Sequence, residues 1–150
     1  MDLKKEMVMI SAMRADGRKQ LSTISRQTGI PISTLFDMVR KTDKIQKHTC
    51  LINFAKLGFT MRANVVMKVE QSRKDELKRF LLKCPNLNSL YRINNGYDFM
   101  AELIYRELKD LEFFIERLDH FAVKEKSVYY IIEDLARETF LSDASLVALV

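Results

Sequence analysis

The sequence is poor in the residues that metal sites, redox sites and nucleotide-binding loops require. It has two cysteines, Cys50 and Cys84, and two histidines, His48 and His120, and neither pair is close along the chain. This spacing argues against a zinc site and a disulfide framework, and it favours reduced thiols in a cytosol. With four glycines, the sequence contains no phosphate-binding loop or dinucleotide fingerprint. We therefore expect no metal and no cofactor.

Long apolar runs and an acid–base set are also missing. No 18 consecutive residues are apolar, so no transmembrane helix and no membrane partner are expected. The N-terminal stretch "MDLKKEMVMISAM" lacks a long apolar core followed by a small-residue cleavage site, so we expect no signal peptide. No nucleophile–base pair is visible. These absences predict a cytoplasmic protein that is not an enzyme.

The positive charge is concentrated in the first part of the chain. Residues 1–60 hold 11 basic and 5 acidic residues, whereas residues 61–150 hold 14 basic and 15 acidic residues. A basic segment beside a near-neutral one indicates a partner for the basic part that carries negative charge, and nucleic acid is the first candidate. The alternative is a solvated surface on which positive residues cluster by chance.

The first part of the sequence predicts three helices separated by tight turns. Apolar residues recur at helical spacing over residues 2–15, where Asp2 is placed to cap the helix. Two short helices follow, over 21–28 and from Pro31 to about residue 42, and Gly29 separates them. Two helices joined by a glycine turn are typical of a helix-turn-helix, whose second helix enters the major groove of DNA.

Polar and charged side chains on these two helices are the candidate contacts to duplex DNA. Hydroxyls, cations and free amides near the start of a helix bind phosphates and base edges. The candidate DNA-binding residues are Ser22, which we also expect to cap its helix, Arg26, Ser33, Thr34, Asp37, Arg40 and Lys41. We expect Ile24, Ile30, Leu35 and Val39 to face inward. Many α-helical proteins contain such a pair of helices, so the pattern alone leaves DNA binding open.

The rest of the sequence predicts an antiparallel sheet with two helices. Near-alternation predicts a strand over 45–52, and a domain boundary is expected near Gly58. Strand, helix, strand, strand, helix and strand are then expected over 63–70, 73–84, 87–94, 97–106, 107–121 and 126–134, with a hairpin turn at Asn95-Gly96. The predicted fold class is α+β: an N-terminal (winged) helix-turn-helix domain over 1–58 and a C-terminal ferredoxin-like βαββαβ domain over 59–150.

Three stretches of this sequence resemble the Lrp/AsnC, or feast/famine, family of transcription regulators. They are "ADGRKQLSTISRQTGIPISTL", "LINFAKLGF" and "LYRINNGYDFMAELIYRELKDLEFFIERL", and the resemblance covers roughly residues 5–135. It implies a DNA-binding regulator that forms a homodimer or higher oligomer through its second domain and responds to amino acids or related metabolites. Asp37 and Met38 stand where the family often has two arginines, and Asn95 stands where it usually has glycine.

The second domain carries two further expectations. Helices should cover only one face of the sheet, so the other face is expected to pack against a second copy, and the apolar tail "SLVALV" is expected to pack on the body or on that copy. An amino-acid effector is expected near the hairpin turn at a subunit interface, where amides face a carboxylate and an acidic residue faces an ammonium group. The alternative is that Asn95-Gly96 is only a tight turn, which Asp98 caps. The candidate effector-binding residues are Asn94, Asn95, Gly96, Tyr97 and Asp98.

Two functions from different classes therefore stand. The first is a sequence-specific, DNA-binding transcription regulator that responds to a small metabolite. The second is a sensor or interaction protein of the same fold with weak or no DNA binding, which the acidic Asp37 favours because it would repel phosphate.

Overall fold

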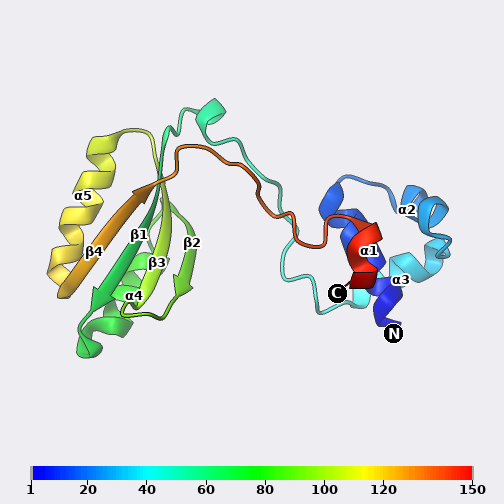
Figure 1. Cartoon of the computed structure of the whole chain (residues 1–150), viewed down its shortest axis with the longest axis horizontal. Helices are drawn as coiled ribbons and strands as arrows, with labels where there is room; N and C mark the ends of the chain where they lie inside the picture. Colours follow the sequence, from blue (N-terminus) through cyan, green and yellow to red (C-terminus); the bar gives the residue numbers. More distant parts are fainter. Residues whose placement is uncertain (1, 150) are drawn as a thin grey trace. The chain divides into compact units, whose positions relative to one another are not determined.

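The chain forms two compact units, which are shown in a computed structural model that describes residues 2–149 (Figure 1). One unit comprises Met1–Leu51 and Leu135–Val150, and the other comprises Ile52–Asp134. The division expected from the sequence was 1–58 and 59–150, and its two terminal residues lie outside the described part. In the structure the chain crosses between the units twice, so the last segment joins the helices rather than the sheet.

The first unit is built on three helices, α1 (Leu3–Ala15), α2 (Leu21–Thr28) and α3 (Ile32–Lys41). The predicted cap of α1 is confirmed: the Asp2 carboxylate accepts hydrogen bonds from the N–H groups of Lys4 and Lys5, at 3.1 and 3.4 Å. Gly29 ends α2 in the left-handed conformation, with φ 72°. This glycine lets the chain reverse sharply into α3.

The core of this unit consists of side chains from all three helices and the turn: Met9, Ala12, Ile24, Ile30, Leu35 and Met38. Val39 packs at its edge, as the sequence predicted for an inward position. On α1, the side chain of Leu3 is exposed, whereas those of Glu6 and Met9 are buried. Apolar residues lie on several sides of α1, so its sequence permits more than one inward face.

The strand expected over 45–52 is not present. Residues 43–53 form neither helix nor strand, and Leu51 and Ile52 are exposed. An alternating pattern produces a strand only where a second strand pairs with it, and every described strand lies between Met61 and Tyr130. For the same reason the part of residues 2–51 that the structure describes has no wing.

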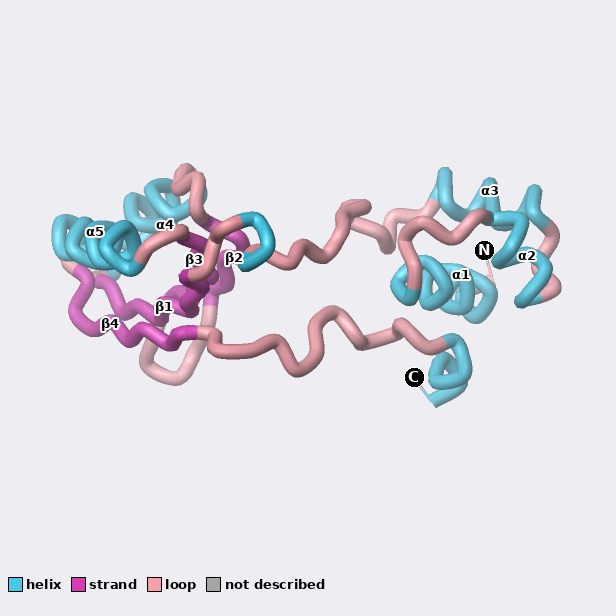
Figure 2. Tube along the Cα trace, turned by 90° about the horizontal axis from the view of Figure 1, so that it is seen from above, coloured by secondary structure: helices cyan, strands magenta, loops and turns pink. Residues whose placement is uncertain are grey.

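The second unit is an antiparallel sheet of β1 (Met61–Val69), β2 (Leu87–Arg92), β3 (Phe99–Tyr105) and β4 (Val123–Tyr130), in the order β2-β3-β1-β4. The helix α4 (Lys74–Leu82) follows β1, and α5 (Leu108–Leu118) follows β3. Both helices lie on the same face of the sheet (Figure 2). The α+β class and the ferredoxin-like βαββαβ order predicted from the sequence are confirmed.

Alternate residues of the strands point to the helices and form the larger core. Val65 and Met67 of β1 pack with Leu77 and Leu81 of α4, and with Leu111 of α5, all fully buried. The bounds 126–134 predicted for the last strand are wrong, because β4 begins at Val123 and ends at Tyr130. Its last partner on β1 is Ala63, near the start of that strand, so there is little further backbone with which to pair.

The C-terminal segment packs on α1 within the helical unit (Figures 1 and 2). Arg14 donates a hydrogen bond from Nε to the carbonyl of Phe140, at 2.7 Å, and from Nη2 to the carbonyl and the carboxylate of Glu138, both at 3.1 Å. Val147, in the final 3-10 helix Ala144–Leu149, is buried. The tail therefore packs on the chain's own body, one of the two alternatives expected; its last residue lies outside the described part.

Candidate functional site

The outer surface of α3 is the first candidate site. Leu35 and Met38 fix the orientation of this helix because both are buried in the three-helix core. The exposed residues of α3 are Ile32, Ser33, Phe36, Asp37, Arg40 and Lys41, and Thr34 is half-buried. Five of the seven predicted DNA contacts thus lie on α3, four of them fully on its surface. Their contact with DNA stays a prediction.

Two apolar residues, Ile32 and Phe36, also lie on this surface and were not predicted there from the sequence. Ile32 and Phe36 are 52% and 60% exposed, although both are large and apolar. They lie one helical turn apart and therefore form one ridge. Met38 is 3% exposed and points into the core, so it does not replace a DNA-facing arginine. Placing Leu35 and Met38 inward on a helical projection would have placed Phe36 outward.

Asp37 is paired with the two cations beside it. Its Oδ1 lies 3.4 Å from Nη2 of Arg40 and 3.8 Å from Nζ of Lys41, at one-turn spacing along the helix. All three side chains are more than half exposed, so these pairs contribute little to stability. Their effect is on charge: the carboxylate neutralises part of the positive charge that α3 would present to a phosphate.

The predicted contacts on α2 lie at its surface. Ser22 and Arg26 are both exposed. The prediction that Ser22 caps α2 is wrong: the helix begins after Gln20, no side chain caps it, and the Ser22 hydroxyl lies 3.5 Å from Oε1 of Gln20. The exposed Arg18 in the preceding turn adds positive charge close to the start of α2 in the sequence.

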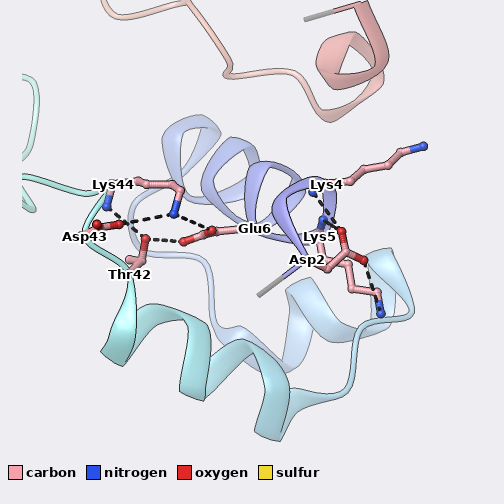
Figure 3. Close-up of polar contacts among 7 residues, drawn as sticks. All are labelled: Asp2, Lys4, Lys5, Glu6, Thr42, Asp43 and Lys44. Atoms are coloured by element: carbon pink, nitrogen blue, oxygen red, sulfur yellow. Dashed lines mark hydrogen bonds and ion pairs between the residues drawn. The ribbon is translucent and has the colours of Figure 1, made fainter.

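A buried carboxylate joins the start of α1 to the end of α3 (Figure 3). Glu6 is 1% exposed; its Oε1 accepts a hydrogen bond from the Thr42 hydroxyl at 2.5 Å, and its Oε2 lies 3.0 Å from Nζ of Lys44. The Thr42 hydrogen bond, together with Lys44, lowers the pKa of Glu6 below its ordinary value. These contacts fix the C-terminal end of α3 against α1.

The hairpin between β2 and β3 is the second candidate site. Asn95 and Gly96 both have positive φ, 63° and 89°, and the N–H of Ile93 donates to the carbonyl of Asp98 at 3.0 Å. The predicted Asn-Gly turn is therefore confirmed. Of the five predicted effector contacts, Asn94, Asn95 and Gly96 are exposed, and Tyr97 and Asp98 are half-buried.

Asp98 already has partners for both carboxylate oxygens. Its Oδ1 lies 2.7 Å from Nζ of Lys74 on α4, and its Oδ2 accepts a hydrogen bond from the N–H of Val69 at 2.9 Å. Burial alone would raise the pKa of Asp98, but Lys74 and the Val69 N–H more than offset it, so the pKa lies below its ordinary value. An effector ammonium at this carboxylate would have to compete with Lys74.

The sheet face opposite the helices carries a polar centre within an apolar surround. The Glu102 carboxylate, on β3, accepts hydrogen bonds from Nε of Arg62 on β1 and from Nδ2 of Asn88 on β2, both at 2.6 Å. Arg62 also donates from Nη1 to Asp134, at 2.5 Å. Val66 and Ile104 lie beside this centre on the same two strands. The face is thus partly apolar, as expected, but it is not uniformly so.

Residues 2–149 lack two other kinds of feature. No helix in this range has both the length and the apolar character needed to cross a membrane. The same range contains no group of three or more histidine, cysteine or acidic side chains placed to hold a metal ion.

The chain is similar to transcription regulators of the helix-turn-helix type. No family model matches the chain. The HTH-type transcriptional regulator FL11 of Pyrococcus horikoshii is 26% identical over 134 residues, which cover 87% of this chain and 89% of that protein. FL11 of Pyrococcus furiosus is 25% identical over 141 residues, which cover 92% of this chain and 92% of that protein.

Solved structures show the same fold. LrpC of Bacillus subtilis superposes with a TM-score of 0.78 at 19% identity, covering 87% of this chain and 94% of LrpC. The transcriptional regulator NMB0573 of Neisseria meningitidis, solved as a complex with L-Met, has a TM-score of 0.80 at 10% identity and covers 91% and 93% of the two chains. The resemblance to Lrp/AsnC regulators noted in the sequence is confirmed: the homologues are HTH-type transcriptional regulators, and the structural neighbours include Lrp and AsnC-family regulators.

Proposed function

Because its homologues are helix-turn-helix regulators of the Lrp/AsnC type, we propose that this chain is a sequence-specific, DNA-binding transcription regulator that responds to an amino acid or related metabolite. The observation that carries the proposal is the pair α2 and α3, joined at Gly29, with α3 fastened to the core by Leu35 and Met38 and exposed on its other side. This arrangement presents α3 as the helix that enters the major groove. We also propose a cytoplasmic location, which the similarity to transcription regulators supports.

We assign two roles to the exposed polar side chains. Arg26, Arg40 and Lys41 contact phosphates, which gives affinity for any duplex sequence. Ser33 and Thr34, in the first turn of α3, lie where recognition helices contact base edges, and therefore contribute to sequence preference. Ser22 and Asp37 are the remaining proposed DNA-binding residues. The pairing of Asp37 with Arg40 and Lys41 limits how far these two cations extend toward phosphates.

A homodimer is part of this proposal. The sheet face opposite α4 and α5 presents Val66 and Ile104 around the Arg62–Glu102 pair, and Tyr91 and Tyr129 on the outer strands are both more than half exposed. A second copy packed on this face would remove those rings from water. Two helix-turn-helix units related by a two-fold axis would then bind a roughly palindromic site.

We place the effector at the hairpin turn. Asn95 and Gly96 present exposed backbone to a carboxylate, and the Asp98 carboxylate lies just beyond the turn. The Neisseria regulator in complex with L-Met supports an amino acid as the class of ligand. Competition between Lys74 and the ligand ammonium would link effector binding to the contact between α4 and the hairpin.

The alternative is a sensor or interaction protein of the same fold with weak or no DNA binding. The pairing of Asp37 with Arg40 and Lys41 favours it, because this pairing reduces the positive charge available on α3.

The deciding experiment is selection of bound duplexes from random-sequence DNA with the full-length protein, followed by titration of the selected site at several salt concentrations. A regulator should enrich a roughly palindromic sequence and bind it about 1,000-fold or more tighter than random DNA. The logarithm of its affinity should fall linearly with the logarithm of the salt concentration. Failure to bind any duplex at low salt would reject DNA binding and leave the alternative.

A further inference from the structure

The ridge formed by Ile32 and Phe36 is the feature that the proposed function leaves unexplained. Both side chains are large and apolar, and both are more than half exposed, at 52% and 60%. They come from the first and second turns of α3, at positions one helical turn apart. These are the turns that a recognition helix directs at base edges.

We propose that Phe36 and Ile32 read thymine, by apolar contact with the C5-methyl groups that thymine presents in the major groove. This inference rests on the proposed DNA-binding function and adds the chemistry of its sequence preference. Thymine is the only DNA base with a methyl group in that groove, and phenylalanine is among the side chains that contact it. Contact with the methyl groups would remove the exposed ring of Phe36 from water.

The charge on α3 supports thymine over guanine as the base that is read. Guanine is read chiefly by an arginine or lysine that donates two hydrogen bonds to O6 and N7. On α3 the only such side chains are Arg40 and Lys41, in the last turn, and both are paired with Asp37. The apolar ridge, in contrast, carries no charge that Asp37 could neutralise, and it lies closer to the start of the helix.

The surroundings of the ridge fit DNA better than a second protein. Arg40 continues the same row of side chains one turn beyond Phe36, and Arg26 is exposed on α2. Residues 1–60 carry six more basic than acidic side chains. A small apolar ridge bordered by positive charge complements a groove whose floor carries methyl groups and whose walls are phosphates.

The test removes the methyl groups and the ring separately. In the duplex site selected with the wild-type protein, each thymine is replaced in turn by uracil, which lacks only the C5-methyl. Replacement at the contacted positions should weaken wild-type binding about fourfold per methyl group. Phe36→Ala should bind the thymine site more weakly, and at those same positions it should not distinguish thymine from uracil.

Phe113→Ala is the matched control, because Phe113 is 62% exposed and lies on α5 in the other unit. This variant should respond to uracil as the wild type does. The uracil arm with the wild-type protein needs no variant, so it remains decisive if Phe36→Ala folds poorly. Ile32→Ala should shift the uracil response at fewer positions than Phe36→Ala, because its side chain is smaller.

The outcomes separate this inference from the proposed function. If the wild-type protein binds its site and no uracil replacement changes the affinity, the thymine contact is wrong while DNA binding stands. If Phe36→Ala changes the oligomeric state in sedimentation and keeps the wild-type uracil response, the ridge is a protein contact and the inference is again wrong. If no duplex is bound at all, the proposed function fails, and the thymine contact fails with it.

Discussion

The buried carboxylate of Glu6, at the start of α1, accepts a 2.5 Å hydrogen bond from the hydroxyl of Thr42, the residue that ends α3. Glu6 lies on the first helix and Thr42 at the end of the third, so this hydrogen bond joins the two ends of the three-helix segment. Lys44 adds an ion pair to the same carboxylate. The orientation of the proposed recognition helix therefore depends on a group that titrates.

The stability of the helical unit should fall at acidic pH through Glu6. Because folding lowers the pKa of Glu6 from its ordinary value of 4.5, the ionised carboxylate stabilises the fold fully at pH values above that ordinary pKa. This contribution is lost as the pH falls through the lower pKa of the folded state. Thermal unfolding followed by circular dichroism from pH 7 to pH 2 should show the loss. Glu6→Gln should be less stable at pH 7 and should change less with pH; an unchanged pH profile would contradict this role.

Substitutions at two nearby positions of α3 should have very different effects on stability. Met38→Ala should lower the free energy of unfolding by about 2–5 kcal/mol, because it leaves a cavity among buried side chains. Phe36→Ala should change it by about 0.5 kcal/mol or less, because the ring is exposed. Denaturant unfolding measures both. A stable Met38→Ala together with an unstable Phe36→Ala would mean that α3 is rotated relative to the orientation described.

Removing the charge of Asp37 should strengthen DNA binding. Asp37→Asn frees Arg40 and Lys41 to contact phosphates, so affinity at low salt should rise about tenfold or less, with a steeper salt dependence. Arg40→Ala and Lys41→Ala should do the reverse, each reducing the slope of log affinity against log salt by about 1. Asp110→Asn, on α5, is the control. Weaker DNA binding by Asp37→Asn than by the wild-type protein would show that this carboxylate itself contacts a base.

Effector binding should depend on the Asp98–Lys74 pair. Calorimetric titration with a panel of amino acids should show a ligand that the wild-type protein binds and that Asp98→Ala binds about tenfold or more weakly. Lys74→Ala should bind it more tightly, because the ligand ammonium no longer competes for the carboxylate. Asp75→Ala, an exposed acid on the same helix, should leave the affinity unchanged. Unchanged affinity in Asp98→Ala would place the effector elsewhere.

The Arg62–Glu102 pair should matter far more than the pairs at the surface. Arg62→Met leaves the buried Glu102 carboxylate with Asn88 but without a cation, which should lower the free energy of unfolding by about 3 kcal/mol. The exposed pair Lys68–Glu125 provides the comparison, since Lys68→Met should cost about 1 kcal/mol or less. Equal effects of the two substitutions would show that the sheet face is more open to water than its burial indicates.

Local signals in the sequence predicted the parts of the fold that local chemistry controls. Asp2 caps a helix, Gly29 ends one, and Asn95-Gly96 makes a hairpin because each acts on the backbone of its immediate neighbours. The strand expected over 45–52 failed because a strand also needs a partner elsewhere in the chain. No local signal shows how far pairing with β1 extends. The predicted bounds of the last strand therefore differ from those of β4 in the structure.

The sequence predicted that the polar residues of α3 lie on its surface, but it did not predict that this surface is partly apolar. Polar residues of α3 were assigned to the surface by their type, and this placed Ser33, Asp37, Arg40 and Lys41 correctly. The same rule hid Phe36, since an apolar residue is expected inside. The pairing of Asp98 with Lys74 could not be predicted either, because it joins a hairpin to a helix that is distant along the chain.

The helical unit is discontinuous along the sequence, since the chain leaves it after Leu51 and returns at Leu135. During synthesis, α1 leaves the ribosome long before Glu138 and Phe140, the residues that Arg14 contacts in the folded unit. A protease that cuts once in the exposed segment 43–53 would sever one of the two connections between the units. The N-terminal fragment would then still be held by the C-terminal segment packed on α1, so nicked protein should migrate as one particle until it is denatured.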